Sequence, residues 1–337
     1  MNNTSINCEE ILARFPPPPP RMSMVVKSLY CVFILVFSLI TLTGNAFVIA
    51  SVAMVKTLQK RTHAFVVAVA CADIGVAIFV MPFRLYEEWN GGWLLGESFC
   101  LTVNMFDGVF CSVSMCTLCC LAIERYLAVC RPFLHAKIKP SLVIIIIAVC
   151  WSLPIAGWGI FLFNQYHIVG IEDFVFCVLD GACPLITNLV STLVLGIVPF
   201  WLPLLVMTFC YVRIFVTANR HIRVICETTI TDADRRLQLA FTQKMKAAKT
   251  LGIVIGCFLV CWLPFFIVVT GDAVEGFQWS VQLKISVTWL GYLNSMMNPF
   301  LYYIFSSEFK AAFRSIVKCM RGYSDDRLGY SSNTISS

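Results

Sequence analysis

The chain has 337 residues, of which 59% are hydrophobic and 13% are charged. Because soluble domains carry about 25% charged residues, this composition excludes an ordinary soluble protein and predicts a membrane protein. The net charge of +6 does not indicate nucleic acid as a partner, since the basic residues gather in alternate connections between apolar segments.

The N-terminal residues 1–25 are predicted to form an extracellular tail. Their FPPPPP run at 15–20 cannot continue a helix and is expected to be extended. Asn2 and Asn3 each begin an Asn-X-Ser/Thr triplet, so both are candidate glycosylation sites. No basic leader with a cleavage site precedes the first long apolar run, and that run is therefore expected to be a retained span.

Seven apolar segments are long enough to cross about 30 Å of hydrocarbon as α-helices. Residues 26–304 are therefore predicted to form an all-α, seven-helix transmembrane domain. The expected spans are 26–54, 62–86, 97–129, 140–164, 186–216, 244–271 and 280–304.

The charges predict the orientation of these spans. Twenty of the 25 Lys and Arg residues lie in alternate connections and in the C-terminal tail, which the positive-inside rule assigns to the cytoplasm. The other connections and the N-terminal tail hold ten acids and five bases, and would attract cations. We therefore expect a multi-pass protein of the plasma membrane with an extracellular N-terminus.

Polar residues within several spans indicate an internal cluster, because each must be paired or hydrated. Packed together, they would either hold a small hydrated cation such as sodium, with Asp73 and Ser114 as ligands, or form a buried hydrogen-bond cluster that fixes helix packing. The members are Asn45, Asp73, Ser114, Asn294, Ser295 and Asn298.

The third span carries one carboxylate, Asp107, deep in its apolar run and the triplet Glu124-Arg125-Tyr126 at its inner end. The eighteen residues from Asp107 to Arg125 make about five helical turns and about 27 Å, so both side chains lie on one helix face. A carboxylate in hydrocarbon costs roughly 2.5–3.5 kcal/mol, which predicts a cationic partner for Asp107. An acid satisfied within the protein is the alternative.

Beyond the last span, residues 305–319 are predicted to form an amphipathic helix on the inner membrane surface. Its apolar face would hold Phe309, Phe313, Ile316 and Val317. Cys319 is a candidate palmitoylation site. Residues 320–337 are expected to be a cytoplasmic tail.

These features resemble the rhodopsin-like (class A) G-protein-coupled receptors. The resemblance covers every span and consists of Gly44-Asn45, Ala72-Asp73, Cys100 with Glu124-Arg125-Tyr126, Trp151, Pro203 with Tyr211, Cys261-Trp262-Leu263-Pro264, and Asn298-Pro299-Phe300-Leu301-Tyr302. It implies a heterotrimeric G protein as partner. Glu124, Arg125, Tyr126, Tyr211, Asn298, Pro299 and Tyr302 would serve in activation and coupling.

Within that family, the sequence resembles the amine-binding branch, most of all the trace amine-associated receptors, through residues 246–258 and 289–295. The resemblance implies that Asp107 binds an ammonium and that Tyr292 hydrogen-bonds Asp107. Trp262, Phe265 and Phe266 would enclose the ligand, since aromatic faces stabilise cations. The implied coupling is stimulatory or olfactory, raising cyclic AMP. A serotonin- or histamine-type amine receptor and a peptide- or lipid-binding receptor are the alternatives.

Four cysteines, Cys8, Cys100, Cys177 and Cys183, fall on the predicted outer side, and four cysteines allow three pairings. The family resemblance implies Cys100–Cys183 and Cys8–Cys177. A bridge within the loop, Cys177–Cys183, is the rival.

The fifth span predicts which amines fit. Residues 192–203 offer no serine pair for catechol hydroxyls and no acid for a second ammonium, while Leu195 and Gly196 leave an apolar wall with room. This favours an aliphatic monoamine or an aromatic amine without ring hydroxyls. Arg84 at the outer end of the second span is expected to snorkel or to pair with Glu87 or Glu88, or else to engage an acidic ligand group or repel dications.

Lys244 lies where some receptors of the family carry an acid that holds the arginine of the inner triplet. Without that lock, elevated basal activity is expected.

Other classes of function find little support. The sequence shows no catalytic triad and no His or Cys group with metal spacing, so an enzyme is not expected, and no cofactor is expected apart from an allosteric sodium ion. A lysine for a retinal Schiff base is missing from the middle of the seventh span, where Tyr292 lies. Internal repeats typical of transporters are not evident.

Overall fold

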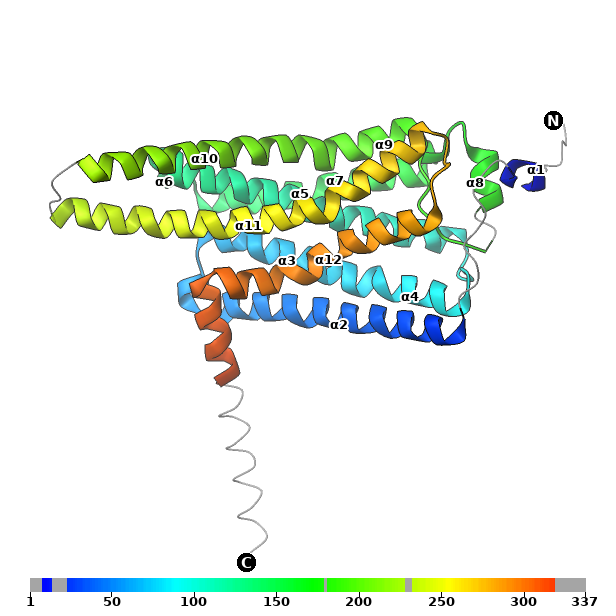
Figure 1. The fold of residues 1–337 in the computed structure, drawn as a ribbon, viewed down its shortest axis with the longest axis horizontal. Coiled ribbons are helices and arrows are strands. Elements are labelled where there is room, and N and C mark those ends of the chain that lie inside the picture. Colours follow the sequence, from blue (N-terminus) through cyan, green and yellow to red (C-terminus); the bar gives the residue numbers. More distant parts are fainter. Residues whose placement is uncertain (1–7, 14–22, 179–180, 228–231, 319–337) are drawn as a thin grey trace, which may run out of the picture.

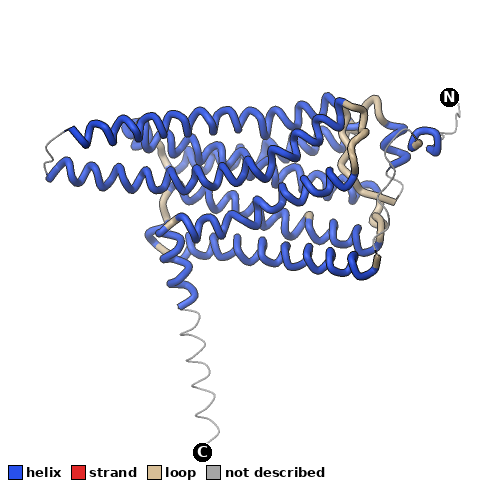
Figure 2. The backbone as a smooth tube through the Cα atoms, in the orientation of Figure 1, coloured by secondary structure: helices blue, strands red, loops and turns tan. Residues whose placement is uncertain are grey.

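The computed structural model describes residues 8–13, 23–178, 181–227 and 232–318. Helices and their connecting loops make up this part of the chain (Figure 2). Three predicted modification sites, Asn2, Asn3 and Cys319, lie outside the described residues.

Helices that lie side by side form the body of the molecule (Figure 1). They are α2 (Met24–Met54), α3 (Arg61–Phe79), α4 (Met81–Asn90), α5 (Glu97–Cys130), α7 (Pro140–Phe163), α9 (Leu189–Gly196), α10 (Leu202–Glu227), α11 (Asp232–Val274) and α12 (Val281–Phe305). A short helix, α1 (Cys8–Leu12), precedes them, and short helical pieces lie in the connections: η1 (Lys56–Leu58), α6 (Pro132–Lys137), η2 (Tyr166–Ile168) and α8 (Glu172–Val178).

The helix α5 lies at the centre of the bundle, since it packs against α3, α7, α10 and α11. Many of its side chains are therefore buried along its whole length, from Cys100 to Val129. Charged groups in the middle and inner part of α5, such as Asp107 and Glu124, consequently face other helices rather than lipid or water.

The outer surface of the bundle is apolar. Along α2, large side chains such as Leu29, Phe33 and Leu39 are half or more exposed, which suits contact with hydrocarbon and not with water. By length and composition, six helical stretches of the described chain can cross a membrane. The helix α12 is not among them, because polar residues such as Lys284, Asn294 and Asn298 lower its hydropathy. It nevertheless packs against α2, α3 and α11 as the seventh member of the bundle.

Two spans are less regular than expected. The second span breaks at Val80 into α3 and α4, because Pro82 lacks an N–H donor and its ring collides with the preceding turn. The fifth span contains a π-helical stretch, Ile197–Trp201, around Pro199, and so differs from the single helix expected over 186–216. Such bulges re-aim the side chains that follow them.

The two ends of the bundle differ. One end, called here the disulfide end, carries two disulfide bonds, Cys8–Cys177 and Cys100–Cys183, which are the pairs that the family resemblance implied. At the opposite end, α10 and α11 extend beyond the other helices (Figure 1).

A further helix over residues 307–318 turns away from the bundle axis at that opposite end (Figure 1). Its Phe309 ring stacks on Tyr302 with centroids 5.3 Å apart, and Phe313 packs edge-on against Phe47 at 6.0 Å. Ile316 is buried as well, whereas Val317 is 39% exposed. The aromatic face of this helix thus packs against the end of the bundle. Val317, at the edge of that face, remains exposed and could contact a membrane surface.

Candidate ligand site and signalling elements

The Asp107 side chain lies in the interior of the bundle, near its disulfide end. The Tyr292 hydroxyl of α12 donates a hydrogen bond of 2.5 Å to Asp107 Oδ2, and the Cys111 thiol lies 3.5 Å from Oδ1. Only 18% of the Asp107 side chain is exposed. A carboxylate held this way in a low-dielectric interior strongly favours a cation beside it.

The Arg84 side chain of α4 supplies such a cation from within the protein. Its Nη2 lies 3.7 Å from Asp107 Oδ2 and 2.6 Å from Asn104 Oδ1. Its Nη1 donates to the Cys183 carbonyl at 2.9 Å and lies 3.5 Å from Glu87 Oε2. The expected pairing with Glu87 is thus present, and the contact with Asp107 was not anticipated from the sequence.

The loop that ends at Cys183 takes part in this arrangement. Its backbone N–H donates to Glu87 Oε1 at 2.7 Å, while its carbonyl accepts from Arg84. The Cys100–Cys183 disulfide fixes that loop to the start of α5. Covalent attachment therefore holds the loop backbone against Glu87 and Arg84, beside Asp107.

An aromatic group from α11 and the π-helical stretch lies deeper in the bundle. The Phe266 ring stacks on Phe200 with centroids 4.0 Å apart, and the Phe265 and Trp262 rings meet edge to face at 5.5 Å. Trp262 also closely approaches Gly291, where an added Cβ would lie 3.0 Å from the indole. The absence of a side chain at position 291 thus makes room for the indole.

The apolar wall expected from the fifth span is partly present. Gly196 faces Phe266, since a Cβ added there would lie 3.6 Å from the ring. Leu195 is partly buried beside it. Phe200, fully enclosed among these rings, was not singled out from the sequence, because nothing in the sequence revealed the π-helical stretch that carries it.

At the opposite end of the bundle, Arg125 pairs with its neighbour. Its Nε lies 3.2 Å from Glu124 Oε2, and the other oxygen of Glu124 accepts from the Thr62 hydroxyl at 2.7 Å. The His135 Nε2 of α6 lies 2.7 Å from the same oxygen. Neither His135 nor Thr62 was singled out from the sequence, because neither belongs to a motif found there.

Other residues predicted to act in signalling lie around this end. The Tyr126 ring packs against Phe209 with centroids 6.0 Å apart, and Tyr211 contacts the Ala248 carbonyl at 3.5 Å. The expectation for Lys244 concerns a side chain outside the described residues.

Most residues of the predicted polar cluster are brought together between α2, α3 and α12. Asn298 donates to Asp73 Oδ2 at 2.8 Å, and Asn45 donates to the Ser295 carbonyl at 3.0 Å. Among the described residues, several buried polar atoms of the cluster lack a hydrogen-bond partner: Asn45 Oδ1, Asp73 Oδ1, Ser114 Oγ, Asn294 Oδ1 and Asn298 Oδ1. Unpartnered oxygens of this kind are the ligands that a hard cation takes.

Pro299 of α12 packs closely against Gly44, beside this cluster. A Cβ added at Gly44 would lie 3.0 Å from Pro299 Cγ. Tyr302, one turn further along α12, is buried at the base of the cluster and stacks on Phe309.

Comparison with known proteins places this arrangement in a family. The family model of the 7 transmembrane receptor (rhodopsin family) matches residues 44–302, which include every span from the end of the first to the seventh. The chain belongs to the rhodopsin family of seven-transmembrane receptors. It is therefore a multi-pass membrane receptor and not an enzyme.

The similar curated proteins locate the receptor within that family. It is 36% identical to trace amine-associated receptor 13c of Danio rerio, over 82% of each chain. It is 32% identical to octopamine receptor beta-2R of Chilo suppressalis and to 5-hydroxytryptamine receptor 4 of Cavia porcellus, in both cases over 88% of this chain and 81% of the relative. The receptor thus lies in the amine-receptor branch, together with trace amine-associated receptors.

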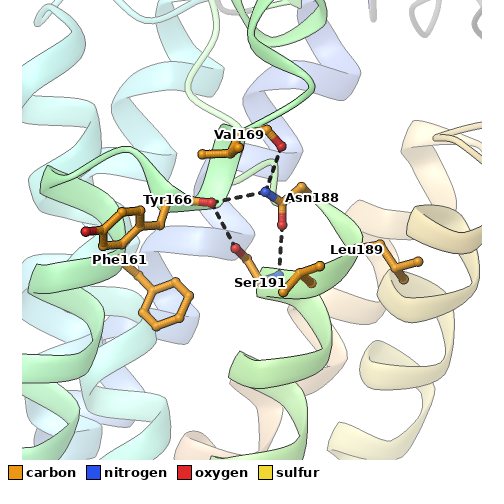
Figure 3. A pocket seen from close by; sticks show the side chains of 7 residues that line it. Phe161, Tyr166, Val169, Asn188, Leu189 and Ser191 are labelled. Carbon is orange, nitrogen blue, oxygen red and sulfur yellow. Dashed lines mark hydrogen bonds between the residues drawn. The ribbon is translucent and has the colours of Figure 1, made fainter.

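A separate hollow of about 430 Å³ lies near the disulfide end of the receptor, between the end of α7 and the start of α9 (Figure 3). Asn188 organises it by donating to the Tyr166 and Val169 carbonyls at 3.0 and 2.9 Å, and Ser191 also donates to Tyr166. Its lining is otherwise apolar and includes Phe161 and Leu189. Among the described residues, the side chains that line this hollow are uncharged.

Proposed function

We propose that this receptor binds a small amine whose ammonium pairs with Asp107, and that binding activates a heterotrimeric G protein of the stimulatory or olfactory type, raising cyclic AMP. The observation that carries this proposal is a carboxylate buried in the centre of the bundle and oriented by Tyr292 at 2.5 Å. Oriented carboxylates in an apolar setting bind cations far better than hydrated ones do. The disulfide end of the bundle, where the ligand would enter, is extracellular in this proposal.

The walls of the site support a ligand with few polar groups. Thr192, the one hydroxyl of the 192–203 stretch, is engaged with Thr187 at 2.7 Å and is buried. Phe200 and Phe266 present stacked rings beyond Leu195 and Gly196. An aliphatic amine or an aromatic amine without ring hydroxyls leaves no buried polar group unsatisfied there, whereas a catechol would.

Activation in this proposal is a shift between two arrangements of the bundle, driven by an amine that binds one of them better. The Trp262 indole lies against Gly291 and two residues before Pro264, a natural hinge in α11. Movement there would displace the long inner part of α11 and open the surface around Arg125. In the active form Arg125 leaves Glu124 and meets the G protein.

The polar cluster is proposed to hold a sodium ion in the inactive arrangement. The unpartnered oxygens of Asp73, Ser114 and Asn294 support this, because buried oxygens need a partner. Asp73 supplies the charge and the neutral oxygens complete the coordination.

An amine panel tests the proposed function. Cells expressing the receptor or its Asp107→Ala variant would be exposed to alkyl, aryl and indole amines, with surface expression and cyclic AMP measured together. We expect a cyclic AMP response to at least one amine in the wild type and its loss in the variant at equal surface expression. Survival of every response in the variant would refute the amine site.

A second measurement distinguishes the identity of the ligand from the identity of the coupled G protein. The same panel, read with a set of G-protein dissociation sensors, would show which G protein responds. Activation through an inhibitory G protein alone would overturn the proposed coupling and leave the ligand assignment intact.

A further inference from the structure

The outer part of the ligand site contains two carboxylates and one guanidinium. Glu87 lies 3.5 Å from Arg84 Nη1, and Asp107 lies 3.7 Å from Arg84 Nη2. The Arg84 side chain is 19% exposed, so it is largely shielded from solvent. Among the described residues, no other basic side chain forms an ion pair with either acid.

The position of Arg84 is set by two neutral partners as well as by the acids. Its guanidinium donates to Asn104 Oδ1 and to the Cys183 carbonyl, at 2.6 and 2.9 Å. A planar guanidinium that donates hydrogen bonds in several directions has little freedom to adopt another position. Arg84 therefore stays in the site when a ligand arrives.

The charge balance of this group determines what it can accept. Glu87 and Asp107 contribute two negative charges, and Arg84 contributes one positive charge, so the unliganded group carries one net negative charge. A ligand with one ammonium neutralises it. A ligand with two would leave a positive excess next to Arg84 in a poorly solvated site, where like charges repel strongly.

We propose that Arg84 is a specificity-determining residue that limits the site to one ligand cation, by neutralising Glu87 and thereby denying α,ω-diamines a second acid. This inference rests on the proposed binding of amines to Asp107. It assigns the ligand class as monoamines, and it identifies Glu87 as a latent second ammonium site that Arg84 masks.

Removal of the positive charge tests the inference. The full-length receptor and its Arg84→Gln variant would be compared on matched pairs: linear monoamines and α,ω-diamines of four to eight carbons, and the ω-amino acid of each length. Glutamine keeps a donor for the Cys183 carbonyl and removes the charge. We expect the ratio of diamine to monoamine potency to rise at least tenfold, which corresponds to about 1.4 kcal/mol.

Three further variants keep the test decisive if Arg84→Gln reaches the surface poorly. Arg84→Lys retains the charge and should keep the wild-type ratio. Glu87→Gln leaves Arg84 facing Asp107 alone and should weaken monoamines severalfold. The double variant Arg84→Gln/Glu87→Gln should lose the diamine gain, because the second acid is gone.

A matched control removes another basic side chain at the same end of the receptor. Lys284 pairs with Asp272 at 2.7 Å, away from the contacts of Arg84. Lys284→Gln should leave the diamine to monoamine ratio unchanged. A rise in that ratio equal to the one in Arg84→Gln would show a general field effect and would overturn the local role of Arg84.

The remaining outcomes are distinguishable. An unchanged ratio in Arg84→Gln, or a diamine gain that persists in the double variant, overturns the inference while the amine site stands. A preference of the wild type for the ω-amino acids that is lost in Arg84→Gln would show that Arg84 binds a ligand anion, and would also overturn it. Failure of the wild type to respond to any amine would instead overturn the proposed function.

Discussion

Tyr292 on α12 and Asp107 on α5 are joined by a hydrogen bond of 2.5 Å, although 185 positions separate them in the chain. Both side chains are largely enclosed by the bundle. The hydroxyl donates to the oxygen that Arg84 also approaches. Tyr292 thus orients the carboxylate. In the proposed function, the carboxylate would still be able to pair with the ammonium of a ligand.

Replacement of Tyr292 by Phe should weaken amine binding without abolishing it. The variant removes one hydrogen bond to a charged group, worth about 1.5–3 kcal/mol in proteins, part of which the ligand recovers by approaching the freed oxygen. We expect about a tenfold loss in amine potency, measured as the concentration for half-maximal response at matched surface expression. A potency equal to that of the wild type would contradict an orienting role.

Two glycines near the site offer a matched packing test. A Cβ at Gly108 would lie 2.2 Å from the Trp158 ring, whereas a Cβ at Gly157, on the neighbouring helix α7, would meet no atom within 4 Å. Gly108→Ala should therefore destabilise the receptor by about 1–3 kcal/mol through overpacking. Gly157→Ala should be neutral or slightly stabilising, since alanine favours helix.

The comparison between these glycine variants would use thermal unfolding of detergent-solubilised receptor, followed by the exposure of buried thiols. A lower melting temperature for Gly108→Ala alone is the expected result. Equal melting temperatures would mean that Trp158 moves aside freely, despite its 3.0 Å hydrogen bond to Ser112.

Glu124→Gln is expected to raise basal signalling. Glutamine still accepts from Thr62, but it no longer forms the ion pair with Arg125 at 3.2 Å. If that pair stabilises the inactive arrangement, as proposed above, its loss should shift the population toward coupling. The measurement is ligand-free cyclic AMP relative to mock-transfected cells.

Glu308→Gln provides the control for this experiment. Glu308 lies at the same end of the bundle and pairs with Lys60 at 2.6 Å on the surface. Its loss should leave basal signalling as it is in the wild type, since exposed pairs contribute little. Equal elevation in both variants would indicate a nonspecific effect of charge on this end.

Sodium should lower the affinity for agonists through the polar cluster. Replacing about 100 mM KCl by NaCl at constant ionic strength is expected to reduce agonist affinity severalfold, because sodium would bind the inactive arrangement better. Asp73→Asn should abolish this difference, since it removes the one carboxylate among the unpartnered oxygens of the polar cluster. A sodium effect that persists in Asp73→Asn would place the ion elsewhere.

The architecture could be predicted from the sequence, because hydropathy and polar residues within the spans are local signals. The spans, the placement of Asp107 and Arg125 on one helix, and the membership in the amine-receptor branch all follow from residues that lie within single segments. Membership is confirmed by the family match and by relatives such as trace amine-associated receptor 13c.

Features that depend on the path of the backbone between segments could not be predicted. The break at Val80 and the π-helical stretch around Pro199 reset the direction of the residues that follow. Arg84 follows the first of these and Phe200 lies in the second. Periodicity from an unbroken helix therefore gave no reason to place Phe200 among these rings or to expect the contact of Arg84 with Asp107.

The disulfide between Cys100 and Cys183 has a consequence for redox handling of the receptor. Cys183 contacts Glu87 through its N–H and Arg84 through its carbonyl, and Asn104, which binds Arg84, lies within 3.7 Å of both sulfur atoms. Cleavage of this bond is expected to free this part of the loop and to loosen both charged residues. Because both cysteines are buried, at 4% and 0% exposure, the bond is shielded from reductant in the folded receptor, and the arrangement around Arg84 is shielded with it.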